Sequence, residues 1–376
     1  MLYLDTAATT PVRPEVIEAM WPYLTGEFGN PSSSHELGDR AARALADARA
    51  EIAAALGCRP SEVVLTSGGT EADNLAVKGI ALGAPRGRRI VTTAIEHEAV
   101  LESADFLRRM HGFEVVEIPL ESDGSITPDA LRSVLTPDTT LVSVHHANNE
   151  IGTVQPVAAL AEVAREAGVP IHVDAVQSAG WLDVGLAQLG ADAVSVSGHK
   201  LGGPKGVGVL AARAGLPLEP VLHGGGQERG RRSGTENVAF AVALATALRL
   251  APGLHDVPGV TASRDALIAG VEAALPSAIL TGSRTARLPG HASFCFPGTS
   301  GEAVLLELER SGYLTSSGSA CAAGSDEPSH VLVALGIPPE VAQTSVRITL
   351  DSPLDADALV AAVASAVSAV GGLRPL

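Results

Sequence analysis

Cysteine is scarce in this sequence of 376 residues, and its spacing excludes two kinds of site. The three cysteines, Cys58, Cys295 and Cys321, are an odd number and form no Cys-x-x-Cys pair. This pattern argues against a disulfide framework and against a zinc knuckle. At least one thiol is therefore expected to be free.

Lysine is rarer than the 26 basic residues suggest, because only Lys78, Lys200 and Lys205 are lysines. Any reaction that needs a lysine amine has these three candidates.

Long apolar runs and basic stretches are also missing. No run reaches the roughly 18 apolar residues of a membrane span, and the N-terminus lacks the pattern of a secretion signal. We therefore expect a cytoplasmic protein that does not enter the membrane.

The net charge of −16 has no compensating stripe of Lys and Arg, which a nucleic-acid binder needs to displace counterions from phosphates. We expect no direct binding to DNA or RNA.

The middle of the chain has the pattern of an α/β domain. Between Ser34 and Arg249, apolar β-branched runs alternate with Ala- and Leu-rich stretches at helical spacing, as in a parallel sheet with crossover helices. The predicted strands are Glu62–Leu65, Arg89–Thr92, Glu114–Ile118, Thr140–Val144, Pro170–Val173, Ala193–Ser197 and Val207–Ala211.

Helix signals and a change of pattern mark the rest of the chain. Pro14 suits the first turn of a helix, and Leu37–Leu56 is amphipathic and followed by Gly57, which suits a left-handed stop. After residues 250–253 the pattern becomes shorter and mixed, with 261–275 helical and 292–296 extended. This predicts a second, smaller α+β domain.

Polar clusters follow the ends of the predicted strands. Because the carboxyl ends of parallel strands form the ligand crevice of an open sheet, these clusters should converge on one site. They are Ser67–Thr70, Glu96–Glu98, Asn148–Glu150, Asp174–Gln177 and Ser197–Lys200.

The first cluster, Ser67–Thr70, contains Gly68 and Gly69 ahead of a helical stretch. Glycines let the backbone approach an anion, and a helix N-terminus favours a phosphate. A simple turn is the alternative.

Lys200 directly follows an apolar strand and sits among glycines. Its amine is expected to face the crevice, where it can form a Schiff base with pyridoxal phosphate. The alternative is a surface lysine.

Asp174, at a strand end, is suited to keeping a pyridine nitrogen protonated; its alternative role is a helix cap. Gln177 and Asn149 are candidates to hydrogen-bond the ring oxygen, and His97 is a candidate to stack on the ring.

Cys321 lies in a stretch of small residues, 315–325, without apolar periodicity. This predicts an accessible loop whose thiol can ionise and attack, although an incidental small residue is the alternative. Cys58 and Cys295 occur in apolar patterns and are predicted to be core residues. Arg347, in a strand-like run, can bind a substrate carboxylate bidentately, unless it is an exposed strand residue or forms an internal ion pair.

These residues together resemble the cysteine desulfurases, within the fold-type I pyridoxal-phosphate enzymes. The resemblance covers nearly the whole chain and rests on an ordered set of segments: Tyr3–Thr10, Gly29–Ser33, Thr66–Asn74, Asn148–Gly152, Asp174–Gln177, Ser197–Lys200, Arg232–Asn237, Ser316–Cys321 and Glu327–Leu332. It implies a large cofactor-binding domain, residues 13–252, with a mostly parallel seven-stranded sheet, and a small α+β domain, residues 1–12 and 253–376, that carries the Cys321 loop.

The resemblance also implies a role for each matching residue. Lys200 matches the Schiff-base lysine, Asp174 the partner of the ring nitrogen, and Cys321 the cysteine that becomes a persulfide. His97 matches the histidine that stacks on the ring and moves protons, and Arg347 the binder of the substrate carboxylate. The other matches are phosphate contacts or groups near the ring oxygen and substrate: Gly69, Thr70, Ser197, Gly198, His199, Asn149, Gln177 and Thr235, of which Thr235 serves the other subunit of a homodimer.

The implied reaction converts L-cysteine to L-alanine and leaves a persulfide on Cys321 for an iron–sulfur scaffold or a thiolation protein. Cys321 would then ligate an iron–sulfur cluster at most transiently. The alternatives are a selenocysteine lyase, an aminotransferase or a kynureninase-like hydrolase of the same fold, and a non-catalytic scaffold. A metal site formed by His97, His145, His146 and Cys321 is disfavoured, since adjacent histidines on a strand point in opposite directions.

Overall fold

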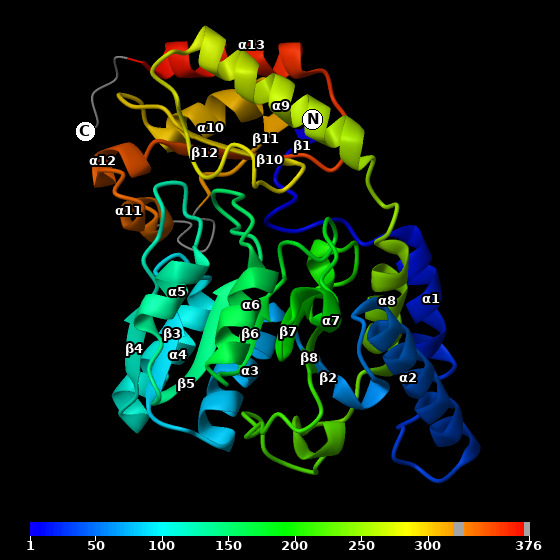
Figure 1. Ribbon diagram of the computed structural model, residues 1–376. Coiled ribbons are helices and arrows are strands. Elements are labelled where there is room, and N and C mark those ends of the chain that lie inside the picture. Colours follow the sequence, from blue (N-terminus) through cyan, green and yellow to red (C-terminus); the bar gives the residue numbers. More distant parts are fainter. Residues whose placement is uncertain (319–326, 372–376) are drawn as a thin grey trace.

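The computed structural model describes residues 1–318 and 327–371. Figure 1 shows a large sheet with its helices at one end of the molecule and a smaller sheet covered by α9, α10 and α13 at the other. Within the two described ranges, no helix is both long and apolar enough to cross a membrane.

The large sheet has seven strands in the order β2-β8-β7-β6-β5-β3-β4. Every predicted strand is present, with ends within two residues of the prediction, and the mostly parallel arrangement is confirmed. Strand β8 is the exception, because it runs antiparallel to both β2 and β7. The strands are β2 Val63–Thr66, β3 Arg89–Thr92, β4 Glu114–Glu117, β5 Thr139–His145, β6 Ile171–Asp174, β7 Ala193–Ser197 and β8 Gly208–Ala212.

Successive residues of these strands enter two separate cores, one on each face of the sheet. Val64 and Ile90 pack with helices α3 and α4, whereas Val63 and Val91 belong to the core that holds α2, α6, α7 and α8. The sheet is thus covered on both faces, as expected for a parallel sheet. The helices are α1 Pro14–Thr25, α2 Glu36–Ala55, α3 Gly69–Gly83, α4 Glu98–His111, α5 Pro128–Val134, α6 Val157–Glu166, α7 Leu186–Leu189 and α8 Val238–Leu250.

The smaller sheet has its own apolar core, in which Phe294 is fully buried and Leu4 from the N-terminal segment takes part. Its strands are β9 Ile279–Leu280, β10 His291–Cys295 and β12 Ser345–Thr349, and its helices are α9 Val257–Ala274, α10 Gly301–Arg310 and α13 Ala356–Val370. Strand β1, Leu2–Tyr3, pairs with β11, Tyr313–Leu314. Two short helices, α11 His330–Ala334 and α12 Pro339–Ala342, complete this end. The residue bounds of the two domains stay a prediction.

The predicted signals at the ends of two helices are confirmed. Pro14 is the first residue of α1. Gly57 has φ 58°, the left-handed conformation that follows α2, and glycine adopts it without a steric cost.

Candidate active site

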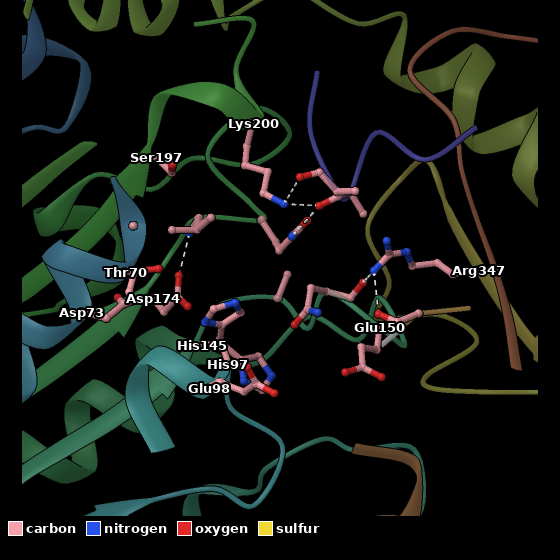
Figure 2. Close-up of a pocket in the computed structure, with 18 of the residues that line it drawn as sticks. Thr70, Asp73, His97, Glu98, His145, Glu150, Asp174, Ser197, Lys200 and Arg347 are labelled. Carbon is pink, nitrogen blue, oxygen red and sulfur yellow. Dashed lines mark hydrogen bonds between the residues drawn. The ribbon is translucent and has the colours of Figure 1, made fainter. Parts of the chain in front are cut away.

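A cavity of about 460 Å³ opens at the carboxyl ends of the parallel strands. Ten of the predicted site residues line it: Gly69, Thr70, His97, Asn149, Asp174, Gln177, Ser197, His199, Lys200 and Arg347. Figure 2 shows Thr70 and Ser197 on one side of the cavity and Arg347 on the opposite side. Two predicted residues, Gly198 and Thr235, are not part of the lining.

The N-terminus of α3 forms one end of this cavity. Gly69 and Thr70 are its first two residues, and the N-cap residue, Gly68, provides no side chain to cap the helix. A Cβ atom on Gly69 would come within 2.8 Å of Val176 Cγ2, so a larger residue here would require Val176 to shift. The backbone amides and the dipole of a 15-residue helix make this end suited to a phosphate.

Ser197 lies at the same end of the cavity, because a Cβ atom on Gly69 would be 3.4 Å from Ser197 Cβ, and His199 also lines the cavity. Ser197 ends β7 and is 2% exposed, and His199 Nδ1 lies 3.1 Å from the Thr9 hydroxyl. Burial and the neighbouring lysines lower the pKa of His199 to about 4, so this histidine is a neutral hydrogen-bonding group at physiological pH. The Gly198 amide donates to Val207 O at 2.9 Å, so it is already hydrogen-bonded within the protein.

Asp174 ends β6 and is 7% exposed. Burial raises the pKa of its carboxyl above the ordinary 3.8, and the Val176 amide, which donates to Oδ1 at 2.9 Å, opposes that rise. A carboxylate held in such surroundings gains most from a cationic partner. A protonated ring nitrogen fits that requirement.

Lys200 reaches into the cavity toward the N-terminal segment (Figure 2). Its Nζ donates to Ala7 O and, at 2.8 Å, to Ala8 O. Gln177 Nε2 donates to the same Ala7 carbonyl at 3.0 Å. The N-terminal segment thus holds both side chains at the cavity, and together with the phosphate end and Asp174 the residues fit a pyridoxal phosphate.

His97 precedes α4 and acts as its N-cap, because its Nδ1 accepts from the Ala99 amide at 3.1 Å. A nitrogen that accepts a hydrogen bond carries no proton. The proton of the neutral ring therefore lies on Nε2.

Arg347 lies on β12 and is 2% exposed, so the alternative of an exposed strand residue is wrong. Its Nη2 donates to Asp5 Oδ1 at 2.7 Å and its Nη1 to the carbonyl oxygens of Asn149 and Gly318, while Nε has no partner. The guanidinium is thus fixed at the cavity by an internal ion pair, the alternative that the sequence left open.

Cys321 lies outside the described residues. The other two cysteines are buried as predicted, Cys295 fully and Cys58 partly. Burial raises the pKa of Cys295 to about 12, and burial with the charge of Glu62 raises that of Cys58 to about 11. Neither thiol ionises near neutral pH, so neither is suited to nucleophilic attack.

Two buried groups at the cavity have no role in the sequence prediction. Asp73 on α3 is 2% exposed, and burial together with the Asp174 charge raises its pKa well above 3.8. His145 ends β5 and is paired with Glu96. The position of His145 at a strand end was the one available signal, whereas Asp73 lies inside a helix pattern.

The metal alternative finds no support in the described part of the chain. No group of three or more His, Cys, Asp and Glu side chains there is arranged to hold a metal ion. His145 lines the cavity, whereas His146 contacts Ser178.

Comparison with known proteins agrees with this arrangement. The model of the class-V aminotransferase family matches residues 2–353. The chain is 45% identical over 352 residues to a cysteine desulfurase IscS of Dictyoglomus turgidum, covering 93% of this chain and 89% of that relative. It is 47% identical over 359 residues to an IscS-like cysteine desulfurase of Mycobacterium tuberculosis, covering 93% and 91%.

Solved structures are similar over the same extent. A NifS-like protein has a TM-score of 0.90 at 35% identity, with 98% of this chain and 100% of that chain covered. A structure titled SspA in complex with cysteine has a TM-score of 0.82 at 35% identity, with 94% and 100% covered.

Proposed function

Because this chain belongs to the class-V aminotransferase family and is a pyridoxal-phosphate-dependent cysteine desulfurase, we propose that it converts L-cysteine to L-alanine with Cys321 as the first sulfur acceptor. The observation that carries the assignment is the cavity itself, which brings Lys200, Asp174, His97 and the N-terminus of α3 together. When bound there, pyridoxal phosphate supplies an electron sink for bond breaking next to the amino-acid Cα.

Groups at the two ends of the cavity would orient the cofactor and the substrate. Gly69, Thr70, Ser197 and His199 would bind the phosphate, and Figure 2 shows Arg347 on the side opposite Thr70 and Ser197. Arg347 binds the substrate carboxylate, with Asn149 beside it, and Lys200 holds the cofactor and moves the proton of the substrate Cα. Asp174 stabilises the protonated ring nitrogen.

Sulfur transfer requires a thiolate on the enzyme. The Cys321 sulfur forms a bond to the substrate sulfur, the substrate Cβ–S bond breaks, and its electron pair remains with carbon, where protonation gives alanine. His97 would stack on the ring, and its Nε2 would donate to the Cys321 thiolate, because Nδ1 accepts from the Ala99 amide. The raised pKa values of Cys58 and Cys295 support Cys321 as the reacting thiol.

Mass spectrometry after incubation with L-cysteine tests the role of Cys321. We expect 32 Da, the mass of one sulfur atom, to be added to the peptide with Cys321, and Cys321→Ser to form no alanine, because the hydroxyl cannot accept sulfur. Cys58→Ser, at a thiol with a pKa of about 11, is the matched control and should retain activity. Alanine formation by Cys321→Ser at the unmodified rate would refute the role.

An absorbance spectrum tests the cofactor lysine. The protein should show a band at roughly 390–420 nm. Lys200→Ala should abolish it, whereas the exposed Lys205→Ala should retain it. A band that survives in Lys200→Ala contradicts this role of Lys200.

We further propose a homodimer in which Thr235 completes the partner's phosphate site. Thr235 is exposed and outside the cavity lining of its own chain. Three apolar side chains on α1, Ile17, Trp21 and Leu24, are 47%, 60% and 51% exposed and repeat at helical spacing, as in a helix with a contact face. Sedimentation of Trp21→Glu should show a larger monomer fraction than the unmodified protein, and an unchanged fraction contradicts this use of α1.

We propose that the persulfide of Cys321 passes to an iron–sulfur scaffold or a thiolation protein. Both classes of acceptor are what the resemblance to the cysteine desulfurases implies. We place the enzyme in the cytoplasm, where reducing conditions keep a catalytic thiol free. Transfer of sulfur from the enzyme, labelled with ³⁵S-cysteine, to a purified scaffold tests the acceptor, and label that stays on the enzyme contradicts it.

A further inference from the structure

His145 lies beside Asp174 at the base of the cavity (Figure 2). The two residues end the neighbouring parallel strands β5 and β6 and are partners in register. Residues paired in this way direct their side chains to the same face of a sheet. His145 is 3% exposed and lines the cavity together with Asp174. The imidazole is thus a close neighbour of the carboxylate that serves the ring nitrogen.

Glu96 holds the imidazole of His145. Its Oε1 accepts from His145 Nδ1 at 2.9 Å and from the Thr93 hydroxyl at 2.6 Å. The Glu96 side chain is fully buried, and its Oε2 has no partner. A carboxylate so far from water requires a cationic partner, and His145 is placed to be that partner.

The second ring nitrogen of His145 makes only a weak contact. It lies 3.4 Å from Gln155 Nε2, whose amide is oriented by bonds to Gly124 O at 2.7 Å and Ile126 N at 2.9 Å. A bond of this length is too weak to hold the ring neutral against Glu96. Burial lowers the pKa of His145, but the Glu96 charge and hydrogen bond raise it more, so the pKa stands above its ordinary 6.5.

The charges around Asp174 show how the charge of His145 affects this carboxyl. Burial is the largest influence and raises the pKa of Asp174; among the neighbouring charges, His97 lowers it, Glu96 raises it and His145 lowers it. Without a cation at position 145, nothing there would oppose the Glu96 charge that acts on Asp174, which favours protonation of one of the two carboxylates. The other titratable groups that face the cavity are Asp73, Glu98, Glu150, His199, Lys200, Glu327, His330 and Arg347.

We propose that His145 is a positioning residue that neutralises Glu96 and thereby keeps Asp174 ionised for the ring nitrogen of the cofactor. The inference rests on the proposed function, because it requires the ring to lie against Asp174. It deepens that function by adding Glu96 and His145 as a buried ion pair behind the cofactor.

Titration of the cofactor-free protein with pyridoxal phosphate, followed by absorbance between pH 6 and 9, tests the ion pair. His145→Asn keeps a donor for Glu96 but removes the charge. We expect about tenfold weaker binding at pH 6, where Asp174 of the variant is largely protonated, with recovery toward pH 9 as Asp174 ionises. The unmodified protein should lack this recovery. His146→Asn, on the adjacent residue, is the matched control and should bind as the unmodified protein does.

Two further variants separate charge from packing. The double variant His145→Asn/Glu96→Gln removes both charges and should bind within about threefold of the unmodified protein, as should Glu96→Gln alone, since Asp174 then has no anionic neighbour at position 96. Unchanged binding by His145→Asn across the pH range overturns the proposal. A double variant as weak as the single one also overturns it. Either result leaves the spectrum of Lys200→Ala, and thus the proposed function, intact.

Discussion

Replacing Arg49 by Met should destabilise the protein by about 3 kcal/mol, because it leaves a buried carboxylate without its cation. Arg49 on α2 binds Glu228 with two parallel hydrogen bonds of 2.7 Å each and also donates to Val63 O at 2.9 Å. The side chains are 11% and 2% exposed. This pair joins a helix, the edge strand β2 and the segment that leads to Thr235.

The size of this loss in stability depends on the hydrogen bonds that Glu228 keeps after Arg49 is replaced. Breaking a buried ion pair from one side costs about 3–5 kcal/mol. The lower value applies because the Leu65 amide still donates to Glu228 at 3.0 Å. The matched control is Arg165→Met in the pair Arg165–Glu162, whose side chains are 73% and 63% exposed. An exposed pair contributes about 0.5 kcal/mol or less.

Urea denaturation followed by circular dichroism, at one pH and one protein concentration, measures both free energies of unfolding. The double variant Arg49→Met/Glu228→Leu should recover part of the loss, because it removes the stranded charge. If Thr235 contacts the phosphate of the partner subunit as proposed, binding of pyridoxal phosphate by Arg49→Met should also weaken, because Arg49 anchors Glu228 in the segment that leads to Thr235. An Arg49→Met protein as stable as Arg165→Met would show that the reasoning about the buried charge is wrong.

Three further substitutions have expected outcomes. Gly208→Ala places a Cβ atom 2.6 Å from the Gly68 backbone and should lower the free energy of unfolding by about 1–3 kcal/mol. It should also weaken cofactor binding at the adjacent turn. An unchanged free energy of unfolding and an unchanged cofactor affinity contradict this prediction. Asp73→Asn should raise the urea midpoint at pH 8, because burial and the Asp174 charge raise the pKa of Asp73 and make its ionisation unfavourable. This increase in the midpoint should shrink as the pH falls toward 3.8, because Asp73 then becomes protonated in the unfolded protein as well as in the folded protein. A midpoint at pH 8 below that of the unmodified protein contradicts the prediction. The hydrogen bond from Arg59 lowers the pKa of Glu62 to about 2, so Glu62→Gln should be less stable than the unmodified protein above pH 4.5. That difference in thermal midpoint should disappear as the pH falls toward 2, and a constant difference rules out the charge.

Local patterns in the sequence predicted most of the fold because they depend on neighbouring residues. Runs of apolar β-branched residues predicted the seven strands, and Pro14 and Gly57 marked helix ends through their own backbone preferences. The antiparallel direction of β8 was not predicted, because strand direction depends on the path of the connection rather than on side-chain period. The carboxyl ends of the parallel strands then placed Asp174 and Lys200 at one cavity, as the sequence led us to expect.

The sequence by itself determined the α/β class, the convergence of polar strand ends and, through family resemblance, the chemistry assigned to Lys200 and Cys321. Only the tertiary structure decided which charges meet. Arg347 pairs with Asp5, 342 positions away, and His145 with Glu96, 49 positions away. No local period encodes such pairs, because they form only when separate strands and loops are brought together. The charge state of the site is therefore a property of the fold, while its reactive groups can be read from the sequence.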